Sequence, residues 1–201
     1  RTFTGCFGLT MLSLPGVTGT YSNEILQYGL SCSVKVDNSV LECHVSPGVG
    51  RNFRVTINSG GQSSLTHRSN LSNISYFTPL LKSVTGAGTR EASTAGGQIV
   101  NVEGDYLGPI VSTASLVIVE YGKYPDSWNF SSPLFPPYRA ICTMLAAHIK
   151  LSCATSPGTG KNHSWRVTVA GQTSSFMHFG TSYGAPIIFT LENKDYEPMN
   201  S

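Results

Sequence analysis

Two stretches of nearly identical text decide how this sequence folds. Residues 43–52 read CHVSPGVGRN, and residues 153–162 read CATSPGTGKN. A further cysteine precedes each stretch by 11 positions, at Cys32 and Cys142. The cysteines repeat at a distance of 110 residues, and the RVTI and RVTV runs that follow, from Arg54 and Arg166, repeat at 112. The chain therefore contains one structural unit twice.

The repeated unit has the pattern of short β-strands joined by tight turns. Apolar Phe53, Val55 and Ile57 alternate with polar residues, which is the period of a strand with one buried face. The Ser-Pro-Gly-x-Gly text and the Gly-Gln turns at Gly61 and Gly171 are typical turn sequences. No stretch carries a convincing helical period. A chain of 201 residues is long enough for two β-sandwiches of about 100 residues each, so we predict an all-β fold.

The paired cysteines predict two local disulfides, Cys32–Cys43 and Cys142–Cys153. Two cysteines 11 positions apart can face each other across a hairpin, and each such bridge contributes about 3 kcal/mol in the loop-entropy description. Four reduced, buried thiols are the alternative, and zinc is disfavoured because its closely spaced Cys-x2-4-Cys pairs are missing. Cys6 has no counterpart in the second copy, so we interpret it as a buried thiol or an intermolecular link.

The composition argues against two classes of partner. Only 12% of residues are charged, the net charge is +2, and no run of Lys or Arg concentrates it, so we expect no nucleic-acid partner. No apolar stretch reaches the roughly 18 to 20 residues of a membrane span. The chain starts at Arg1 without Met or a signal peptide, and we expect it to be processed or a piece of something longer.

Residues that carry catalytic or metal chemistry are sparse. The five histidines are scattered, and neither a His-x-x-x-His pair nor a Gly-x-Ser-x-Gly elbow occurs. Glu103 and Asp105 share one face of a predicted strand, but two carboxylates fall short of the 6 to 8 oxygens that calcium prefers. The SPGTGK text of residues 156–161 lacks the ending of a phosphate loop and precedes a strand. We expect no enzyme, no metal, and no cofactor apart from N-linked glycans.

The text around the second repeat continues as a longer pattern. It reads YFTP at 76–79, TAGG at 94–97, IVNVEGDYLG at 99–108, SPGTG at 156–160 and VTV at 167–169. In order and spacing this resembles the TIG (IPT) family of Ig-like domains over residues 76–182, and the first copy matches from Gly5 onward. The resemblance implies Ig-like β-sandwiches of the kind found in extracellular receptors, adhesins and large surface proteins. A branch of the family occurs in DNA-binding transcription factors, but the predicted disulfides and the weak charge argue against that branch.

The repeat divides the chain into two Ig-like domains and a tail. We predict a first domain at 1–75, a second at 76–182, and a C-terminal extended strand at 183–201. A Tyr-Gly pair repeats at a distance of 93 instead of 110, which predicts an insert of 17 residues, 123–139, in the second domain. The insert is rich in proline and aromatic residues. It is interpreted as a loop folded over its own sandwich or as a loop that bears contacts or glycans.

The two ends of the chain do not match the frame of the repeat. Residues 1–8, RTFTGCFG, match the second strand of the second copy, with Gly5 aligned to Gly104, so the first domain lacks its leading strand, the one before the Gly-Gly turn. The tail YGAPII from Tyr183 resembles YFTPLL from Tyr76, where a leading strand begins. We therefore predict head-to-tail self-assembly by β-strand complementation between copies.

The predicted assembly strand comprises Tyr183, Pro186, Ile187, Ile188, Phe189 and Leu191, and the predicted acceptor comprises Phe3, Phe7 and Leu9. Two alternatives stay open. The chain is a slice of a longer covalent array of such modules, or the segment of residues 1–21 is the donated strand instead.

Four Asn-x-Ser sequons predict N-linked glycans at Asn70, Asn73, Asn129 and Asn162. Glycans would keep a surface with so little charge in solution.

The function predicted from these features is that of a structural glycoprotein subunit of an extracellular filament or surface appendage. Its expected partners are further copies of itself and glycans, at an extracellular or cell-surface location. One alternative is an adhesive or ligand-binding ectodomain fragment of a receptor. Another is an accessory module of a secreted carbohydrate-active enzyme, with Tyr124, Trp128 and Tyr138 as a sugar-binding platform.

Overall fold

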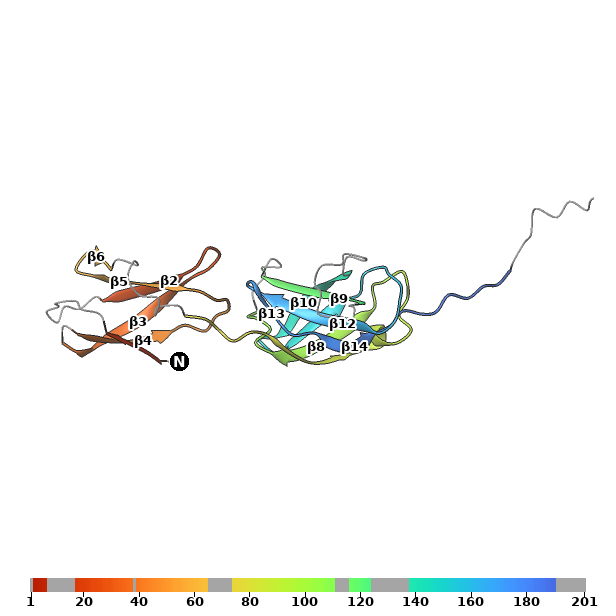
Figure 1. Ribbon diagram of the computed structural model, residues 1–201, viewed down its shortest axis with the longest axis horizontal. Helices are drawn as coiled ribbons and strands as arrows, with labels where there is room; N and C mark the ends of the chain where they lie inside the picture. The colour runs from red at the N-terminus through yellow and green to blue at the C-terminus, as the bar shows by residue number, and fades with distance from the viewer. Residues whose placement is uncertain are drawn as a thin grey trace, which may run out of the picture.

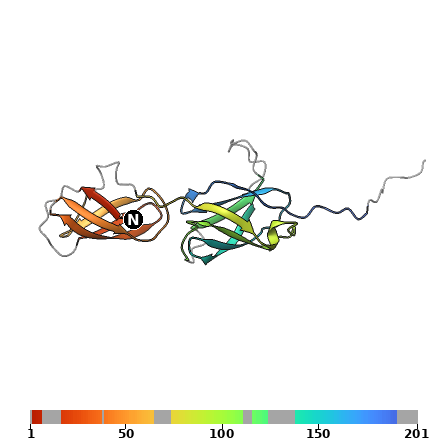
Figure 2. The same ribbon diagram turned by 90° about the horizontal axis from the view of Figure 1, so that it is seen from below.

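The computed structural model describes residues 2–6, 17–37, 39–64, 74–110, 116–123 and 138–190, with backbone only for 2–6 and at Phe179. In this part of the chain the structure is strands and turns, with a single 3-10 turn at Ala87–Thr89. Two domains lie end to end along the long axis, and residues 184–190 extend away from the far end of the second (Figures 1 and 2). Among the described residues no helix has the length and apolarity to cross a membrane.

The first domain is built from the first six strands. They are hydrogen-bonded in the order β1-β4-β3-β2-β5-β6, and every pair is antiparallel. Their bounds are β1 Thr2–Cys6, β2 Thr18–Ser22, β3 Gln27–Val36, β4 Val40–Val45, β5 Arg54–Ser59 and β6 Gln62–Ser63.

The second domain follows the same plan with one more strand at each side. The order is β13-β12-β9-β10-β11-β8-β7, and β14 pairs with β12. The bounds are β7 Leu80–Thr85, β8 Ile99–Asp105, β9 Val117–Gly122, β10 Tyr138–Ala146, β11 Lys150–Ala154, β12 His163–Val169, β13 Gln172–Thr173 and β14 Met177–Thr181.

One long strand in each domain crosses from one sheet of the sandwich to the other. β10 pairs with β9 at residues 138–140 and with β11 at residues 141–146. In the first domain β3 likewise pairs with both β2 and β4. Each domain encloses its own cluster of buried apolar side chains, because one face of every long strand carries the apolar half of the alternating pattern. The predicted all-β fold with two sandwich domains is confirmed.

Both predicted disulfides are present, and each joins residues directly opposite each other on neighbouring strands. Cys32 of β3 faces Cys43 of β4 with their Cα atoms 4.1 Å apart, and Cys142 of β10 faces Cys153 of β11 at 4.0 Å. Cys43 and Cys153 are buried. The bridges therefore pin the register of equivalent strand pairs in the two domains.

The register of the strands corrects the slip inferred from sequence. Tyr21 of β2 pairs with Val55 of β5, and Tyr121, its counterpart in β9, pairs with Trp165 of β12. Val55 therefore corresponds to Trp165, and β5 repeats in β12 at a distance of 110 residues, like the cysteines. Arg166 consequently occupies the place of Thr56, and the alignment of Arg54 with Arg166 at 112 was wrong. A strand pattern has a period of two, so a slide of two residues leaves every apolar side chain on its own face and is invisible in the sequence.

The insert in the second domain is also shorter than the sequence comparison predicted. Tyr21 lies opposite Tyr28, 7 positions on, and Tyr121 lies opposite Tyr138, 17 positions on, so the second loop is longer by 10 residues and not by 17. Tyr138 and Arg139 belong to β10. The error arose because Tyr28-Gly29 was aligned with Tyr121-Gly122, a chance likeness between two different strands.

The strand at the start of the chain occupies the place of β8. Phe3 lies opposite Cys43 as Val100 lies opposite Cys153, so Gly5 corresponds to Val102, two positions from the predicted partner Gly104. In the second domain β7 pairs with the outer edge of β8. Among the described residues, no strand pairs with the corresponding edge of β1.

Candidate functional site

A cage of four aromatic rings closes the end of the first domain that meets the second. Phe53 touches Tyr21, Tyr28 and Tyr76 edge-on, with ring centroids 5.4 to 5.9 Å apart. The Tyr76 hydroxyl donates a hydrogen bond to the carbonyl of Ser46 at 2.5 Å and also contacts the Tyr21 hydroxyl. Burial raises the pKa of both Tyr21 and Tyr76 above its ordinary value, so both phenols stay neutral.

The second domain builds the same cage at its far end with one exchanged centre. Tyr121, Tyr138 and Tyr183 take the places of the three tyrosines, and His163 takes the place of Phe53. The His163 ring lies 5.4 to 5.8 Å from the three tyrosine rings, edge-on to each, as Phe53 does in the first cage. Trp165, at the place of Val55, stacks on Tyr121 at 4.4 Å.

The Ser-Pro-Gly-x-Gly loop is held against each cage by one tyrosine. The Tyr28 hydroxyl bonds the carbonyl and the N–H of Val49, and the Tyr138 hydroxyl bonds those of Thr159, at 3.0 to 3.3 Å. A Cβ at Gly48 or Gly158 would lie 2.7 Å from a cage tyrosine ring or its hydroxyl. These glycines are therefore required for the close approach of loop and ring, beyond their role in the turn.

The position of Tyr183 overturns part of the predicted assembly strand. Its side chain is 6% exposed, and its hydroxyl donates to the Ser156 carbonyl at 2.5 Å and lies 2.6 Å from the Tyr121 hydroxyl. Burial raises its pKa. Tyr183 is therefore a core residue of its own domain and is not free to enter a neighbouring one. Tyr76, predicted to open the second domain, likewise packs in the cage of the first.

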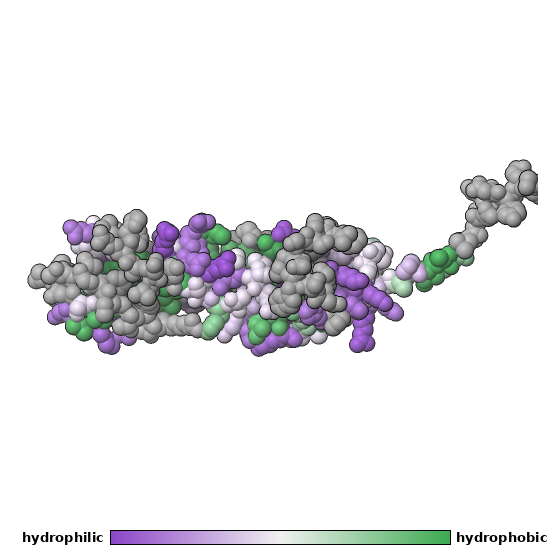
Figure 3. Space-filling model, in the orientation of Figure 1, coloured by the Kyte–Doolittle hydropathy of each residue, from purple (hydrophilic) through white to green (hydrophobic). Residues whose placement is uncertain are grey.

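Residues 184–190 extend from the second domain and are largely apolar. Pro186 is exposed, and the side chains of Ile187, Ile188 and Phe189 are 73%, 75% and 91% exposed. Ile187, Ile188 and Phe189 form the green stretch on the tail in Figure 3. Leu191, the last predicted member of the assembly strand, lies outside the described residues.

Only one of the predicted acceptor residues can be placed. Phe3 lies on β1 opposite Cys43, whereas Phe7 and Leu9 fall outside the described ranges. The backbone of Cys6 pairs with Val40 at the end of β1.

One of the four predicted glycosylation sites lies in the described part of the chain. Asn162 is exposed at the end of the glycine loop with φ 58°, and its N–H donates to the Ser182 hydroxyl at 3.1 Å. The first domain has the same arrangement: Asn52 is exposed with φ 59°, and its N–H donates to Ser75 at 3.0 Å. Asn70, Asn73 and Asn129 lie outside the described residues.

The two carboxylates considered for calcium are each paired with a lysine. Glu103 lies 2.8 Å from the ammonium of Lys150, and Asp105 lies 2.7 Å from that of Lys82. The hydrogen bond and charge of Lys150 lower the pKa of Glu103. Within the described ranges no group of three or more His, Cys, Asp or Glu residues is placed to hold a metal ion.

The sugar-binding platform considered for the insert is not supported at its one described residue. Tyr138 points into the cage, 5.3 Å from the ring of Tyr121 and 5.7 Å from that of His163. It is therefore partly buried against the core of its own domain. Tyr124 and Trp128 lie outside the described residues.

His163 is the residue of this site that sequence reasoning missed. Its side chain is 1% exposed, Nε2 donates to the Thr159 carbonyl at 3.2 Å, and Nδ1 faces the Thr181 hydroxyl at 3.5 Å. Trp165 Nε1 donates to that same hydroxyl at 3.1 Å. Burial lowers the pKa of His163, so the ring is neutral in the folded domain. The 110-residue register, applied to Phe53, was the available signal.

Comparisons with known proteins leave the family open. No family model matches the chain, and no curated protein matches it. Among solved structures it is similar to the plexin A4 extracellular region, at a TM-score of 0.34 and 10% sequence identity, covering 89% of this chain and 26% of that one. The chain thus spans about a quarter of the length of the plexin chain it matches, and a superposition of this quality does not carry function from one protein to the other.

Proposed function

We propose that this chain is a non-catalytic, extracellular structural glycoprotein that assembles into a filament by donating the strand after Tyr183 to a neighbouring copy. The observation that carries the proposal is the equivalence of Tyr183 with Tyr76. Tyr76 sits in the cage of the first domain, and the chain then runs on directly into β7, the leading strand of the second. Tyr183 sits in the second cage in the same way and runs on into an exposed apolar segment.

The donated segment matches a strand whose mode of pairing is visible within the chain. Counted from the two cage tyrosines, Pro186, Ile187 and Ile188 correspond to Pro79, Leu80 and Leu81. Pro79 is buried and Leu81 packs on the core of the second domain. An exposed segment of this composition loses apolar surface to water when it joins a sheet, at about 25 cal/mol per Å².

The acceptor in the proposal is the outer edge of β1. The β7–β8 pairing places Ser83 opposite Glu103. Transferred to β1, the same register sets Thr190 of one copy opposite Cys6 of the next. An edge strand with open hydrogen-bonding groups is a template for pairing with another chain.

The extracellular location and the glycans belong to the same proposal. Two disulfides in a small domain pair are the usual condition of oxidising compartments. Asn162 is supported as a glycan site by Asn52, its counterpart, which stays exposed although the second domain is seated on that end of the first. A glycan on Asn162 is therefore compatible with a further module at the far end.

The test compares two neighbouring charge substitutions in the tail. Ile188→Asp places a charge at the counterpart of the core-facing Leu81, whereas Ile187→Asp alters the counterpart of Leu80, which is half exposed. Sedimentation of the full chain is expected to show linear oligomers for the wild type and for Ile187→Asp, and monomers for Ile188→Asp. Cryo-electron microscopy of the oligomers is expected to show the donated segment on the edge of β1, with Thr190 opposite Cys6.

Three results would overturn the filament proposal. These are equal assembly of the two variants, density that runs unbroken from Ser201 into Arg1 as in a covalent array, and a stable monomeric wild type. The last would leave an adhesive or ligand-binding ectodomain as the function to pursue.

A further inference from the structure

The junction between the two domains has a polar contact at its centre. The Gln172 side-chain amide of β13 donates to the backbone carbonyl of Tyr76 at 3.0 Å. Around this bond Val49 and Leu26 of the first domain join the core cluster of the second, and Gln172 is 8% exposed. The hairpin of β12 and β13 therefore sits on the loop and cage of the preceding domain.

The first domain carries a copy of that hairpin at its own free end. Gln62 of β6 lies at the position of Gln172, 110 residues earlier, and it is exposed. Ser59 pairs with Gln62 as Val169 pairs with Gln172. The turns between them also agree, because Gly60 and Gly61 have φ values of 55° and 80°, and Ala170 and Gly171 have 45° and 79°.

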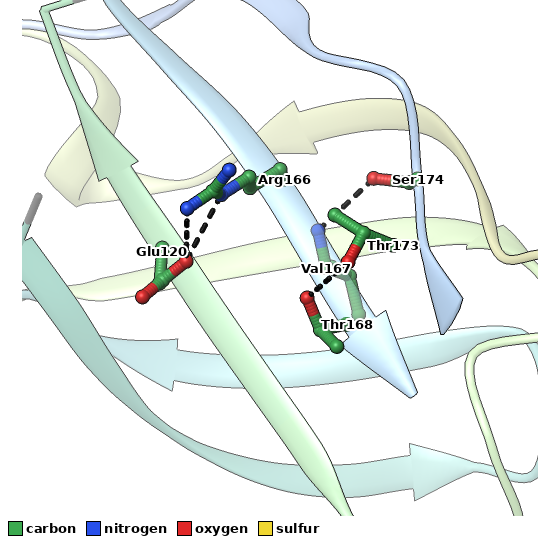
Figure 4. Close-up of polar contacts among 6 residues, drawn as sticks. All are labelled: Glu120, Arg166, Val167, Thr168, Thr173 and Ser174. Atoms are coloured by element: carbon green, nitrogen blue, oxygen red, sulfur yellow. Dashed lines mark hydrogen bonds and ion pairs between the residues drawn. The ribbon is translucent and has the colours of Figure 1, made fainter. Parts of the chain in front are cut away.

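The hairpins are braced by the same side-chain bond. Ser174 accepts a hydrogen bond from the N–H of Val167 at 3.0 Å, with the Thr168–Thr173 pair beside it (Figure 4). Ser64 accepts one from the N–H of Ile57, also at 3.0 Å. Gln62 is therefore held on its domain with the backbone geometry that aims Gln172 at Tyr76.

The receiving surface is likewise duplicated at the far end of the second domain. The N–H of Tyr183 donates to the Gly160 carbonyl at 2.8 Å, as the N–H of Tyr76 donates to that of Gly50 at 2.9 Å. Thr159, in the place of Val49, is exposed, whereas Val49 is 5% exposed beneath the second domain. The far end thus has the form of the junction surface, with Thr159 exposed where Val49 is covered.

We infer that the first domain of a second copy docks on this end, with its Gln62 amide donating to the Tyr183 carbonyl. The inference rests on the proposed function, because the donated strand brings the two surfaces together. It adds a definite contact and a definite geometry. The rotation and translation from the second domain of one copy to the first domain of the next equal those from the first to the second domain within a chain. The filament would then repeat, to a first approximation, once per domain.

The experiment uses the full chain with two matched glutamine variants. Gln62→Ala removes the contact between copies, and Gln172→Ala removes the equivalent contact within a chain. Association of Gln62→Ala is expected to be roughly 2- to 10-fold weaker than that of the wild type, the range for one net hydrogen bond. Gln172→Ala is expected to leave the association constant unchanged, and to alter the angle between domains within a chain in cryo-electron micrographs.

The outcomes separate this inference from the strand-donation proposal. A donated strand on β1, together with junctions between copies that superpose on the internal junction, supports both. A donated strand with a different junction angle, or with an unchanged association constant for Gln62→Ala, overturns the docking contact alone. Absence of the donated strand overturns both.

Discussion

The two cages have the same frame and differ in the residue at the centre. Phe53 fills the first cage with hydrocarbon, and His163 fills the second with a polar ring at the same burial. The polar ring is tolerated because its nitrogens have partners, the Thr159 carbonyl and the Thr181 hydroxyl. A close-packed aromatic site thus accepts a histidine when the surrounding backbone and side chains satisfy its hydrogen bonds.

The cages differ also in what lies outside them. The loop of the first cage is covered by the second domain, so Val49 is buried there and Thr159 is not. An apolar residue stands where a domain is already seated, and a polar one where the surface faces water in a single chain. The two glycine loops thus have the same structure, although one lies beneath a neighbouring domain and the other is exposed to solvent.

The largest expected effect comes from emptying the second cage. Tyr183→Ala removes a ring that packs 5.4 Å from His163 and 5.8 Å from Tyr138, and aromatic-to-alanine changes in a core cost about 3 to 5 kcal/mol. Tyr183→Phe keeps the ring and loses the bond to Ser156, at about 1 kcal/mol. Denaturant unfolding followed by tryptophan fluorescence measures both.

Both tryptophans, Trp128 and Trp165, belong to the second domain, so this signal is specific to it. Tyr76→Ala is the matched control. It empties the first cage and should destabilise the first domain, which near-ultraviolet circular dichroism of its tyrosines follows. Equal unfolding free energies for Tyr183→Ala and Tyr183→Phe would show that the ring is not part of the core.

A smaller effect is expected from acidification, and it separates the two cages directly. Burial lowers the pKa of His163, so the unfolded chain binds the proton first as the pH falls below about 6.5. The free energy of unfolding of the second domain should therefore decrease from there down to the folded pKa, by up to about 1.4 kcal/mol per pH unit. The groups that face the ring are the side chains of Tyr121, Tyr138 and Tyr183, and burial raises the pKa of Tyr121 and of Tyr183.

His163→Phe gives the second cage the same central residue as the first, and it tests whether His163 causes this pH dependence. Between about pH 6.5 and the folded pKa of His163, the unfolding free energy of this variant should depend less steeply on pH than that of the wild type. The reason is that the variant lacks the histidine, which binds its proton at different pH in the folded and unfolded states. Unfolding curves at a series of pH values for the two proteins measure the difference. Identical slopes would mean that His163 has the same pKa in both states.

The sequence was sufficient for the fold but not for the alignment of its two halves. The cysteine spacing predicted both disulfides, because directly opposed cysteines on paired strands are bound to recur at the same interval. The register of β5 and β12 was wrong by two residues, because alternation fixes the face and not the position. His163 was hidden by that error.

The role of Tyr183 was also out of reach of the sequence. The likeness of the text from Tyr183 to that from Tyr76 predicted a new strand from the tyrosine onward, whereas Tyr183 itself packs in the cage of its own domain. Tyr183 completes the core of its own domain, whereas the residues after it leave that domain. A boundary inferred from sequence similarity places all of them in the same element. The hydroxyl bonds to Ser46 and Ser156 decide the matter.

The smallest effect is expected from an ion pair of the second domain that stands in the place of a threonine pair of the first. Arg166 and Glu120 lie opposite each other on β12 and β9, with a 2.9 Å contact (Figure 4), where the first domain has Thr56 opposite Thr20. The double change Arg166→Thr and Glu120→Thr should cost less than about 1 kcal/mol, because both side chains remain partly in water. The single variants complete a double-mutant cycle, and the coupling free energy should shrink in 1 M salt. A coupling above about 2 kcal/mol that salt leaves unchanged would make this pair part of the interior. The outer face of the second domain would then contribute to its stability in a way that the threonine pair of the first does not.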